Sequence, residues 1–179
     1  MKLNAKQLRK TKPSQTDLKD IKRNPIYFVL DEIYDTYNIG SIFRLADAVT
    51  AKKVYLCGDM EYPPSSRIHK AAVGTEEWVP WEKTDSTFET VKDLKNKGVQ
   101  IIAVEQSSKS IDVKKLKPNF PCAIVVGNET TGVSKEVLKV SGKVVELPMY
   151  GVNKSFNVWG SLAVVAYKII EHLDRQELP

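Results

Sequence analysis

The stretch CAIVVGNETTG, residues 122–132, joins a continuous apolar run to a polar loop that has a glycine at each end. Residues 122–126 show no polar alternation, which is typical of a strand buried on both faces of a parallel sheet. Gly127 and Gly132 permit positive φ angles and a close approach of the backbone to a ligand. The stretch therefore predicts an α/β domain with a ligand-binding loop after a central strand.

The same alternation extends along the chain from residue 25. Apolar runs predict strands at 26–30, 53–57, 99–104, 122–126 and 143–147, and helical patterns lie at 40–50, 65–73, 85–97, 134–140 and 155–173. Asp85 and Ser134 are expected to cap helices, and Gly98 to end one. Alternating strands and helices indicate a mostly parallel sheet flanked by helices, with the site in loops 31–40, 127–132 and 148–155.

Composition excludes several classes of protein. The 179 residues are 42% hydrophobic, and the longest apolar runs are strand-length, so we expect neither a membrane span nor a secretion signal. Cys57 and Cys122 lie in separate apolar runs and are expected to be buried thiols in a reducing, cytoplasmic compartment. His69 and His172 stand alone, which favours structural or surface roles for both and no metal site.

The positive charge is concentrated at the N-terminus. Residues 1–25 contain eight Lys/Arg and two Asp, a balance of 8 − 2 = +6, and the remainder has 19 − 20 = −1. We therefore divide the chain into a basic arm, 1–24, and a domain, 25–179. Such an arm suits a polyanion, because each neutralised phosphate releases counterions, although a solubilising tail has the same composition. Its candidate RNA-binding residues are Lys6, Arg9, Lys10, Lys12, Lys22 and Arg23.

The stretch NIGSIFRLADA, residues 38–48, predicts an amphipathic helix. At 100° per residue, Ile39, Ile42, Phe43, Ala46 and Val49 share one face, so Arg44 avoids the core. By phase alone, Arg44 pairs with Asp47 one turn on and Asn38 caps the helix. A functional Arg44 stays open as the alternative. For Glu129 two roles are likewise open: a solvated residue of a turn, or a carboxylate that binds a ligand.

The last helix follows LPMYGVNKSFNV, residues 147–158. Ser155 and Asn157 precede it, where they would either cap the helix or present polar groups to a ligand at its N-terminus. Its apolar stripe is wider than one sheet face needs, which favours a core contact combined with a subunit contact. The stripe comprises Val158, Leu162, Val165, Ala166, Ile169 and Leu173, widened by Trp159 and Ile170.

The blocks NIGSIFRLADA (38–48), VGNETTG (126–132) and LPMYGVNKSFNV (147–158) together resemble the three motifs of the SpoU/TrmH group of SPOUT RNA methyltransferases, in their order and spacing. The resemblance covers about residues 25–173 and leaves the arm outside. It implies a SPOUT-type α/β knot, with a deep trefoil knot in the C-terminal part, and a homodimer. It also implies methyl transfer from S-adenosylmethionine to a ribose 2′-hydroxyl of tRNA or rRNA, without a metal or a membrane.

The resemblance also assigns residues. It makes Arg44 catalytic, with Asn38, Glu129, Ser155 and Asn157 completing the site. We expect Arg44 to bind a substrate phosphate and stabilise the developing alkoxide, since its very high pKa suits a base poorly. Asn38 and Glu129 would orient it, and an RNA phosphate or water would take the proton. The implied cofactor-binding residues are Gly127, Leu147, Phe156, Val104, Glu105 and Met149.

Some positions depart from the family pattern, and rival functions remain. Phe156 stands where leucine is commonest, and the pair Trp159-Gly160 brings a bulky indole to a place where smaller residues are usual, which bears on the packing of the cofactor pocket and the interface. A short chain without a further RNA-binding domain favours tRNA. The rivals are an RNA- or cofactor-binding module without turnover, and an α/β enzyme acting on a small nucleotide, for which the basic arm would be dispensable.

Overall fold

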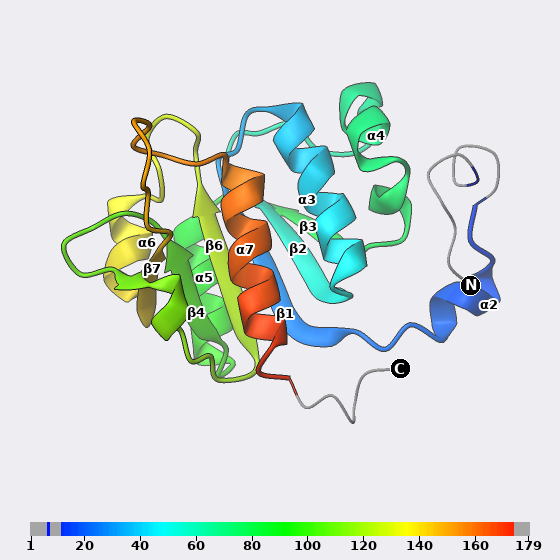
Figure 1. Cartoon of the computed structure of the whole chain (residues 1–179). Helices are drawn as coiled ribbons and strands as arrows, with labels where there is room; N and C mark the ends of the chain where they lie inside the picture. The colour runs from blue at the N-terminus through cyan, green and yellow to red at the C-terminus, as the bar shows by residue number, and fades with distance from the viewer. Residues whose placement is uncertain (1–6, 8–11, 174–179) are drawn as a thin grey trace.

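Seven parallel strands form one sheet in the order β3-β2-β1-β6-β4-β7-β5 (Figure 1). The computed structural model describes residue 7 and residues 12–173, and all statements on structure concern these. The strands are β1 (Asn24–Asp31), β2 (Ala51–Cys57), β3 (Trp81–Thr84), β4 (Gln100–Val104), β5 (Ile111–Asp112), β6 (Cys122–Gly127) and β7 (Lys143–Glu146). Every strand pair is parallel, so the predicted α/β class is confirmed.

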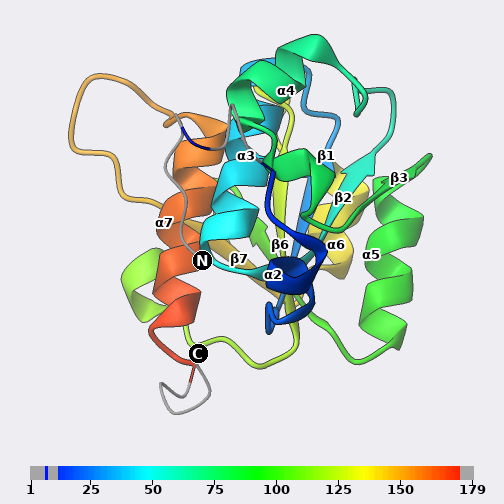
Figure 2. The same ribbon diagram turned by 90° about the vertical axis from the view of Figure 1, so that its right-hand side faces the viewer.

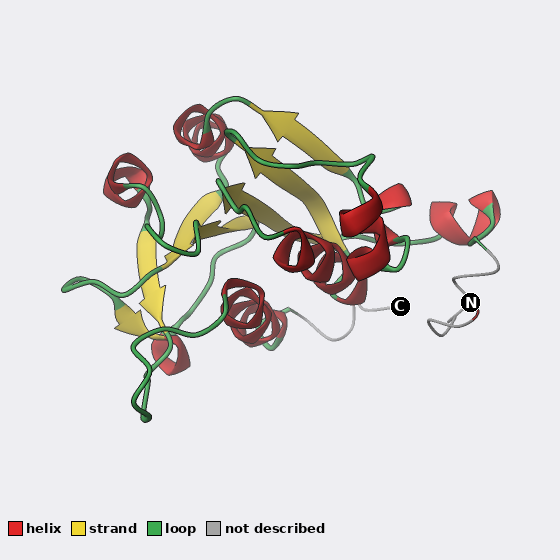
Figure 3. Cartoon of the chain, turned by 90° about the horizontal axis from the view of Figure 1, so that it is seen from above, coloured by secondary structure: helices red, strands yellow, loops and turns green. Residues whose placement is uncertain are grey.

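Helices cover both faces of the sheet (Figure 3). They are α2 (Gln15–Lys19), α3 (Thr36–Ala48), α4 (Ser66–Ala72), α5 (Thr87–Asn96), α6 (Lys135–Val140) and α7 (Val158–Ile170), with 3-10 turns η1 (Thr75–Glu77) and η2 (Val113–Lys115). One core packs α3, α4 and α7 on the sheet, and a second packs α5 and α6 on its other face. All six residues of β6 are buried, as its apolar run predicts, and each large side chain buried there contributes about 1.5–3 kcal/mol.

Several expected boundaries were wrong. Asp35, rather than Asn38, caps α3, because its carboxylate accepts from the Tyr37 amide at 2.8 Å, so the helix starts four residues earlier than predicted. Ser86 replaces Asp85 as the cap of α5. Ser134 occupies the cap position of α6 but makes no side-chain capping bond. The last helix starts at Val158 rather than 155.

Two strands of the sheet were not predicted from the sequence. Trp81–Thr84 is an edge strand with exposed charged residues at its centre, and Ile111–Asp112 is only two residues long. Neither has the apolar continuity that marks a strand buried on both faces. Gly98, by contrast, ends α5 as predicted, with φ of 80°. The central strands were therefore predictable, and the edges were not.

Close packing of α3 against α4 positions the first motif. A Cβ at Gly40 would lie 2.5 Å from the Cβ of Ala71 and 2.8 Å from the carbonyl oxygen of Ile68, closer than real contacts allow. Only glycine lets the two helices approach this far. The glycine in the first motif therefore has a packing role, and α3 is held by α4 on one side and α7 on the other (Figure 1).

The described part of the arm lies beside the start of the sheet (Figure 2). The guanidinium of Arg23 donates to the carbonyl oxygens of Ala51 at 3.1 Å and Trp78 at 2.9 Å, so this residue ties the arm to the domain. Among the described residues, no helix combines the length and apolarity needed to cross a bilayer. Cys57 and Cys122 are buried free thiols, and burial raises the pKa of Cys122 to about 12.

Candidate functional site

A cavity of about 470 Å³ opens where β4, β6 and β7 end. Carboxyl ends of parallel strands meet at one edge of a sheet, which is where ligands bind in such folds. The loop 127–132, the segment 147–157 and the start of α7 form its walls. The sequence prediction expected a site in loops 31–40, 127–132 and 148–155. The last two border this cavity, whereas no residue of 31–40 is among its lining residues.

All six residues predicted to bind a cofactor line this one cavity. They come from three separate segments of the chain: Val104 and Glu105 from the end of β4, Gly127 from the end of β6, and Leu147, Met149 and Phe156 from the segment before α7. Val104, Leu147 and Phe156 give one part of the lining an apolar character. Glutamate, amide and hydroxyl groups give the remainder a polar one.

A chain of hydrogen bonds joins all three motif blocks beside the cavity. The Asn157 amide donates to the Asn38 side-chain oxygen at 3.1 Å, and the Asn38 amide donates to Glu129 Oε1 at 2.9 Å. Asn38 is buried in the first turn of α3, and both Glu129 and Asn157 line the cavity. Residues 38, 129 and 157, far apart in sequence, therefore form one polar unit.

Glu129 is held as a carboxylate. Partial burial acts to raise its pKa, but hydrogen bonds from Asn38, from its own backbone and from the amides of Tyr34 and Asp35 outweigh it, and the pKa is lowered. The Tyr34 and Asp35 amides donate at 3.2 and 3.1 Å. A carboxylate with these partners accepts hydrogen bonds and gives up no proton at neutral pH. Glu129 thus orients groups and does not act as an acid.

The loop after β6 is folded tightly upon itself. A Cβ at Gly127 would lie 2.1 Å from the carbonyl carbon of Gly132, and Gly132 has φ of 71°. Glu105 fastens this loop: its Oε2 accepts from the Val133 amide at 2.9 Å and its Oε1 from the Gln106 amide at 2.8 Å. In the structure Glu105 therefore both lines the cavity and anchors a wall of it.

The segment before α7 presents a free hydroxyl to the cavity. Ser155 is exposed and makes no hydrogen bond within the described chain. Asn157 caps α7, since its Oδ1 accepts from the amides of Trp159 and Gly160 at 3.0 and 3.5 Å. Of Ser155 and Asn157, only Asn157 therefore caps the helix, and Asn157 also bonds to Asn38.

Arg44 lies outside the cavity. It is exposed on α3 in one stripe with Tyr37, Ser41 and Ala48, and among the described residues it has no ion-pair or hydrogen-bond partner. The expected pair with Asp47 was wrong, because Asp47 instead accepts from the indole N–H of Trp78 at 2.6 Å. Asn38 and Glu129 bond to each other and not to Arg44. Within the described residues, Arg44 is therefore an unpaired cation on the helix that also carries Asn38.

The candidate RNA-binding residues of the arm differ in surroundings. Lys12 pairs with Glu77 at 2.5 Å, Lys22 is exposed, and Arg23 is half-buried against the domain. Lys6, Arg9 and Lys10 lie outside the described residues. RNA contact by the arm stays a prediction.

Asp31 and Asn128 are two structural residues of the site that the sequence did not single out. Asp31, buried at the end of β1, accepts from the Thr87 hydroxyl at 2.5 Å and the Ser134 amide at 2.8 Å. Asn128 donates to the Glu32 carbonyl oxygen at 2.8 Å and accepts from the amides of Thr130 and Thr131. An acid ending a buried strand was the available signal for Asp31.

Comparison with curated proteins finds relatives among RNA-modifying enzymes. The tRNA (guanosine(18)-2′-O)-methyltransferase of Aquifex aeolicus is 31% identical over 77% of this chain and 65% of its own length. The 23S rRNA (guanosine-2′-O-)-methyltransferase of Neisseria meningitidis serogroup B is 30% identical over 83% of this chain and 59% of its own. The chain thus spans about three fifths of the length of these relatives.

Solved structures match over most of the chain. The AdoMet-bound rRNA methyltransferase from Sinorhizobium meliloti has a TM-score of 0.79 at 26% identity, covering 88% of this chain and 60% of that one. The A. aeolicus TrmH/SpoU tRNA-modifying enzyme has a TM-score of 0.76 at 27% identity, covering 92% and 79%. The model of the SpoU rRNA Methylase family matches residues 25–167, which include all three motif blocks. The chain therefore belongs to the SpoU rRNA methylase family.

Proposed function

We propose that this chain transfers a methyl group from S-adenosylmethionine to a ribose 2′-hydroxyl of RNA. The observation that carries the proposal is the polar chain Asn157–Asn38–Glu129, which brings three sequence-distant motif blocks together at one cavity. Membership of the SpoU family and the names of the similar enzymes support the same reaction. Of RNA classes we favour tRNA, since tRNA enzymes are prominent among the relatives.

The cavity fits the cofactor in size and chemistry. Its volume of about 470 Å³ falls in the ordinary range for small-molecule sites. The apolar side chains Val104, Leu147 and Phe156 suit a purine ring, and the carboxylates Glu105, Glu129 and Glu146 suit a cationic, hydroxylated ligand. Residues from the loops after β4, β6 and β7 would hold it. When bound, S-adenosylmethionine would supply the methyl group, on a sulfonium that leaves as a thioether.

The remaining work falls to the chain's own residues. A ribose hydroxyl is a poor nucleophile until its proton leaves, so it must be positioned and its developing negative charge stabilised. Arg44 supplies a fixed positive charge that binds an RNA phosphate and stabilises that oxygen. The proton passes to an RNA phosphate or water, because the cavity lining contains no histidine. Asn38 and Glu129 hold the loop 127–133 against α3, and Ser155 offers its free hydroxyl to the ligands.

The position of Arg44 supports a homodimer. Arg44 faces solvent from α3, and the adjoining α7 exposes Trp159, Val164 and Tyr167, an apolar surface beside it. Burying that surface against a second copy would place Arg44 at the subunit boundary, next to a cavity. This arrangement would bring Arg44 to a cavity that, in the described part of one chain, it does not line.

Two further properties belong to the proposal. A trefoil knot in the C-terminal part is supported by the path of segment 147–157. It contacts the loop after β4 through a bond from Gln106 Nε2 to the Lys154 carbonyl oxygen at 2.6 Å, and α7 then returns to β6 and β4. Cytoplasmic location is supported by the two buried thiols.

The decisive experiment incubates the full chain with labelled S-adenosylmethionine and unmodified total RNA. Nuclease digestion and mass spectrometry should find the label on a ribose 2′-oxygen. The variant Arg44→Ala should lose at least about 100-fold in rate, as removal of an oxyanion-stabilising group does in other enzymes, while keeping its cofactor affinity. The control Arg67→Ala, on the exposed face of α4, should retain activity.

Label on bases alone, or no transfer to any RNA, would overturn the proposed reaction. Full activity of Arg44→Ala would overturn only the role of Arg44. Binding of RNA and cofactor without transfer would favour the rival, a binding module. Deleting the arm tests the second rival, an enzyme acting on small nucleotides, which should be unaffected by the deletion. The RNA enzyme should instead lose affinity for RNA and the salt dependence of its binding.

A further inference from the structure

A second polar cluster lies at the junction of α4 and η1, on the side of α3 away from α7 (Figure 1). His69 stands in the last turn of α4, and Glu76 and Glu77 stand in η1. Between them Val73 and Gly74 have φ of 56° and 87°, a left-handed pair that turns the chain back on itself. Both carboxylates are thereby brought to one histidine, which the sequence showed standing alone.

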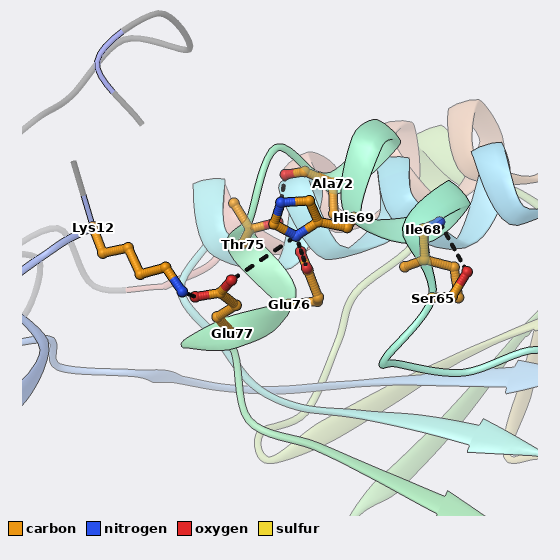
Figure 4. A network of polar contacts seen from close by, with 8 residues as sticks. All are labelled: Lys12, Ser65, Ile68, His69, Ala72, Thr75, Glu76 and Glu77. Atoms are coloured by element: carbon orange, nitrogen blue, oxygen red, sulfur yellow. Dashed lines mark hydrogen bonds and ion pairs between the residues drawn. The ribbon is translucent and has the colours of Figure 1, made fainter. Parts of the chain in front are cut away.

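The three side chains converge on one point (Figure 4). His69 Nδ1 lies 2.6 Å from Glu76 Oε1 and 3.9 Å from Glu77 Oε1. One potential ligand atom from each residue lies within 4.8 Å of the other two. The histidine side chain is 57% exposed, so an ion can reach the cluster from solvent. An imidazole with two carboxylates is a donor set for divalent transition metals.

Glu76 supplies a second, independent observation. The residue is only 8% exposed, and its Oε2 is buried with no hydrogen-bond partner in the described chain. A buried carboxylate oxygen without a partner is costly, because its lost hydration is not replaced. The bond to His69 satisfies the other oxygen alone. The cluster therefore contains a buried carboxylate oxygen for which the described part of the chain supplies no partner.

We propose that His69, Glu76 and Glu77 bind a divalent transition-metal ion of the zinc type. Ligand atoms around a tetrahedral zinc lie about 3.4 Å apart, so shifts of about 1 Å would convert the observed 2.6 and 3.9 Å separations into a ligand set. The ion would replace the proton between His69 and Glu76, and Glu76 Oε2 would gain a partner. This site is separate from the cavity and does not depend on the proposed methyl transfer.

Lys12 provides an internal competitor for the site. Its ammonium pairs with Glu77 Oε2 at 2.5 Å, while Oε1 faces the histidine (Figure 4). The lysine charge opposes a nearby cation and draws Glu77 towards the arm. A bound ion would thus share Glu77 with the basic arm. Removing the Lys12 charge should tighten metal binding, an effect that a plain His–Glu ion pair does not predict.

The test titrates the tag-free full chain with zinc chloride by calorimetry, with cobalt(II) as a visible-spectroscopy probe. One ion per chain should bind, chelator should reverse it, and the Tm should rise with zinc. Glu76→Gln and His69→Ala should each weaken binding at least about tenfold, whereas Lys12→Met should tighten it a few-fold. The control His172→Ala removes the other histidine, in the turn that follows α7, and should leave binding unchanged.

Glu77→Gln guards against misfolding of the variants, because this residue is more exposed than Glu76 and its substitution keeps the shape. It should keep the wild-type Tm without metal and lose the zinc-dependent rise. The proposal fails if zinc does not bind at one per chain, or if His172→Ala removes the binding. It fails equally if Glu76→Gln and Glu77→Gln bind zinc as the wild type does.

Discussion

Two segments border the cavity, and they are held very differently. The loop 128–133 is fastened by hydrogen bonds to Glu32, Tyr34, Asp35, Asn38 and Glu105. In the described chain, segment 148–156 makes one hydrogen bond to another segment, from Gln106 to the Lys154 carbonyl oxygen. Tyr150 and Val152 in it are 85% and 104% exposed.

The difference indicates a division of labour. The loop 128–133 has its final shape before a ligand binds, so none of the binding free energy is lost to ordering it. Segment 148–156 gains partners only when a ligand or a second subunit supplies them, at a cost of about 1–2 kcal/mol for each residue fixed.

Gly127→Ala should have the largest effect. Its Cβ would meet the backbone of Gly132 and Val133 at 2.1 Å, and backbone atoms in a fastened loop cannot move aside. We expect a loss of about 3 kcal/mol or more in the free energy of unfolding, measured in urea, and loss of S-adenosylmethionine binding by calorimetry. Stability and affinity near wild type would show that the loop is pliable and would remove the contrast.

Such packing explains what the sequence could and could not predict. The apolar run 122–126 required a strand buried on both faces, so the central fold was foreseeable, and the glycine-bounded loop beside it marked the edge of the sheet where the cavity opens. The six cavity-lining residues assigned to a cofactor came from the resemblance to the family motifs and not from this pattern. The bond between Asp47 and Trp78 and the contact of His69 with Glu76 could not be predicted from helical phase. The first joins two separate segments, and the second depends on a left-handed turn at Val73. Tertiary contacts decided both.

Glu129→Gln should have the next largest effect. The neutral amide keeps the shape but loses the charge to which Tyr34, Asp35 and Asn38 donate. We expect a loss of about 1 kcal/mol in the free energy of unfolding at pH 7, below the about 1.5–3 kcal/mol typical of hydrogen bonds to charged groups, because the side chain is exposed and screened by solvent. The pKa of Glu129 is lowered in the fold, so its contribution is present above its ordinary value of 4.5 and is lost as pH falls through the lowered one.

Urea unfolding of wild type and Glu129→Gln across pH checks this sign. The difference between the two proteins should be largest near neutrality and shrink in acid, below pH 4.5. Glu146→Gln serves as a control, since Glu146 also lines the cavity but its carboxylate accepts no hydrogen bond within the described chain. A difference that grows towards acid pH would contradict the assigned role of Glu129.

Gly160→Ala should weaken cofactor binding by segment 148–156 and change the thermal stability of the fold little. A Cβ at this position would lie 2.6 Å from the edge of the Phe156 ring, which is 55% exposed and can swing away. Helix propensity favours alanine by up to about 1 kcal/mol and offsets the strain. We expect little change in Tm and a several-fold weaker S-adenosylmethionine affinity, because the displaced ring lines the cavity.

The double variant Phe156→Leu with Gly160→Ala tests whether the two positions act as a pair. The smaller side chain leaves room for the added Cβ, so the double variant should bind S-adenosylmethionine more tightly than Gly160→Ala alone. Purely additive affinities would show that the aromatic ring and the glycine do not depend on each other. The departures from the family pattern at 156 and 160 would then need separate explanations.

Gly151→Ala should have the smallest effect and is the matched partner of Gly127→Ala. No atom lies within 4 Å of a Cβ built at Gly151, and its φ is not positive, so alanine fits without strain. The free energy of unfolding should change by less than about 0.5 kcal/mol, as for other open surface positions. Alanine also restricts the unfolded and the unbound segment, so S-adenosylmethionine affinity should stay equal or rise slightly. A loss of stability comparable with that of Gly127→Ala would mean that segment 148–156 is packed as tightly as loop 128–133, and the division of labour between them would have to be abandoned.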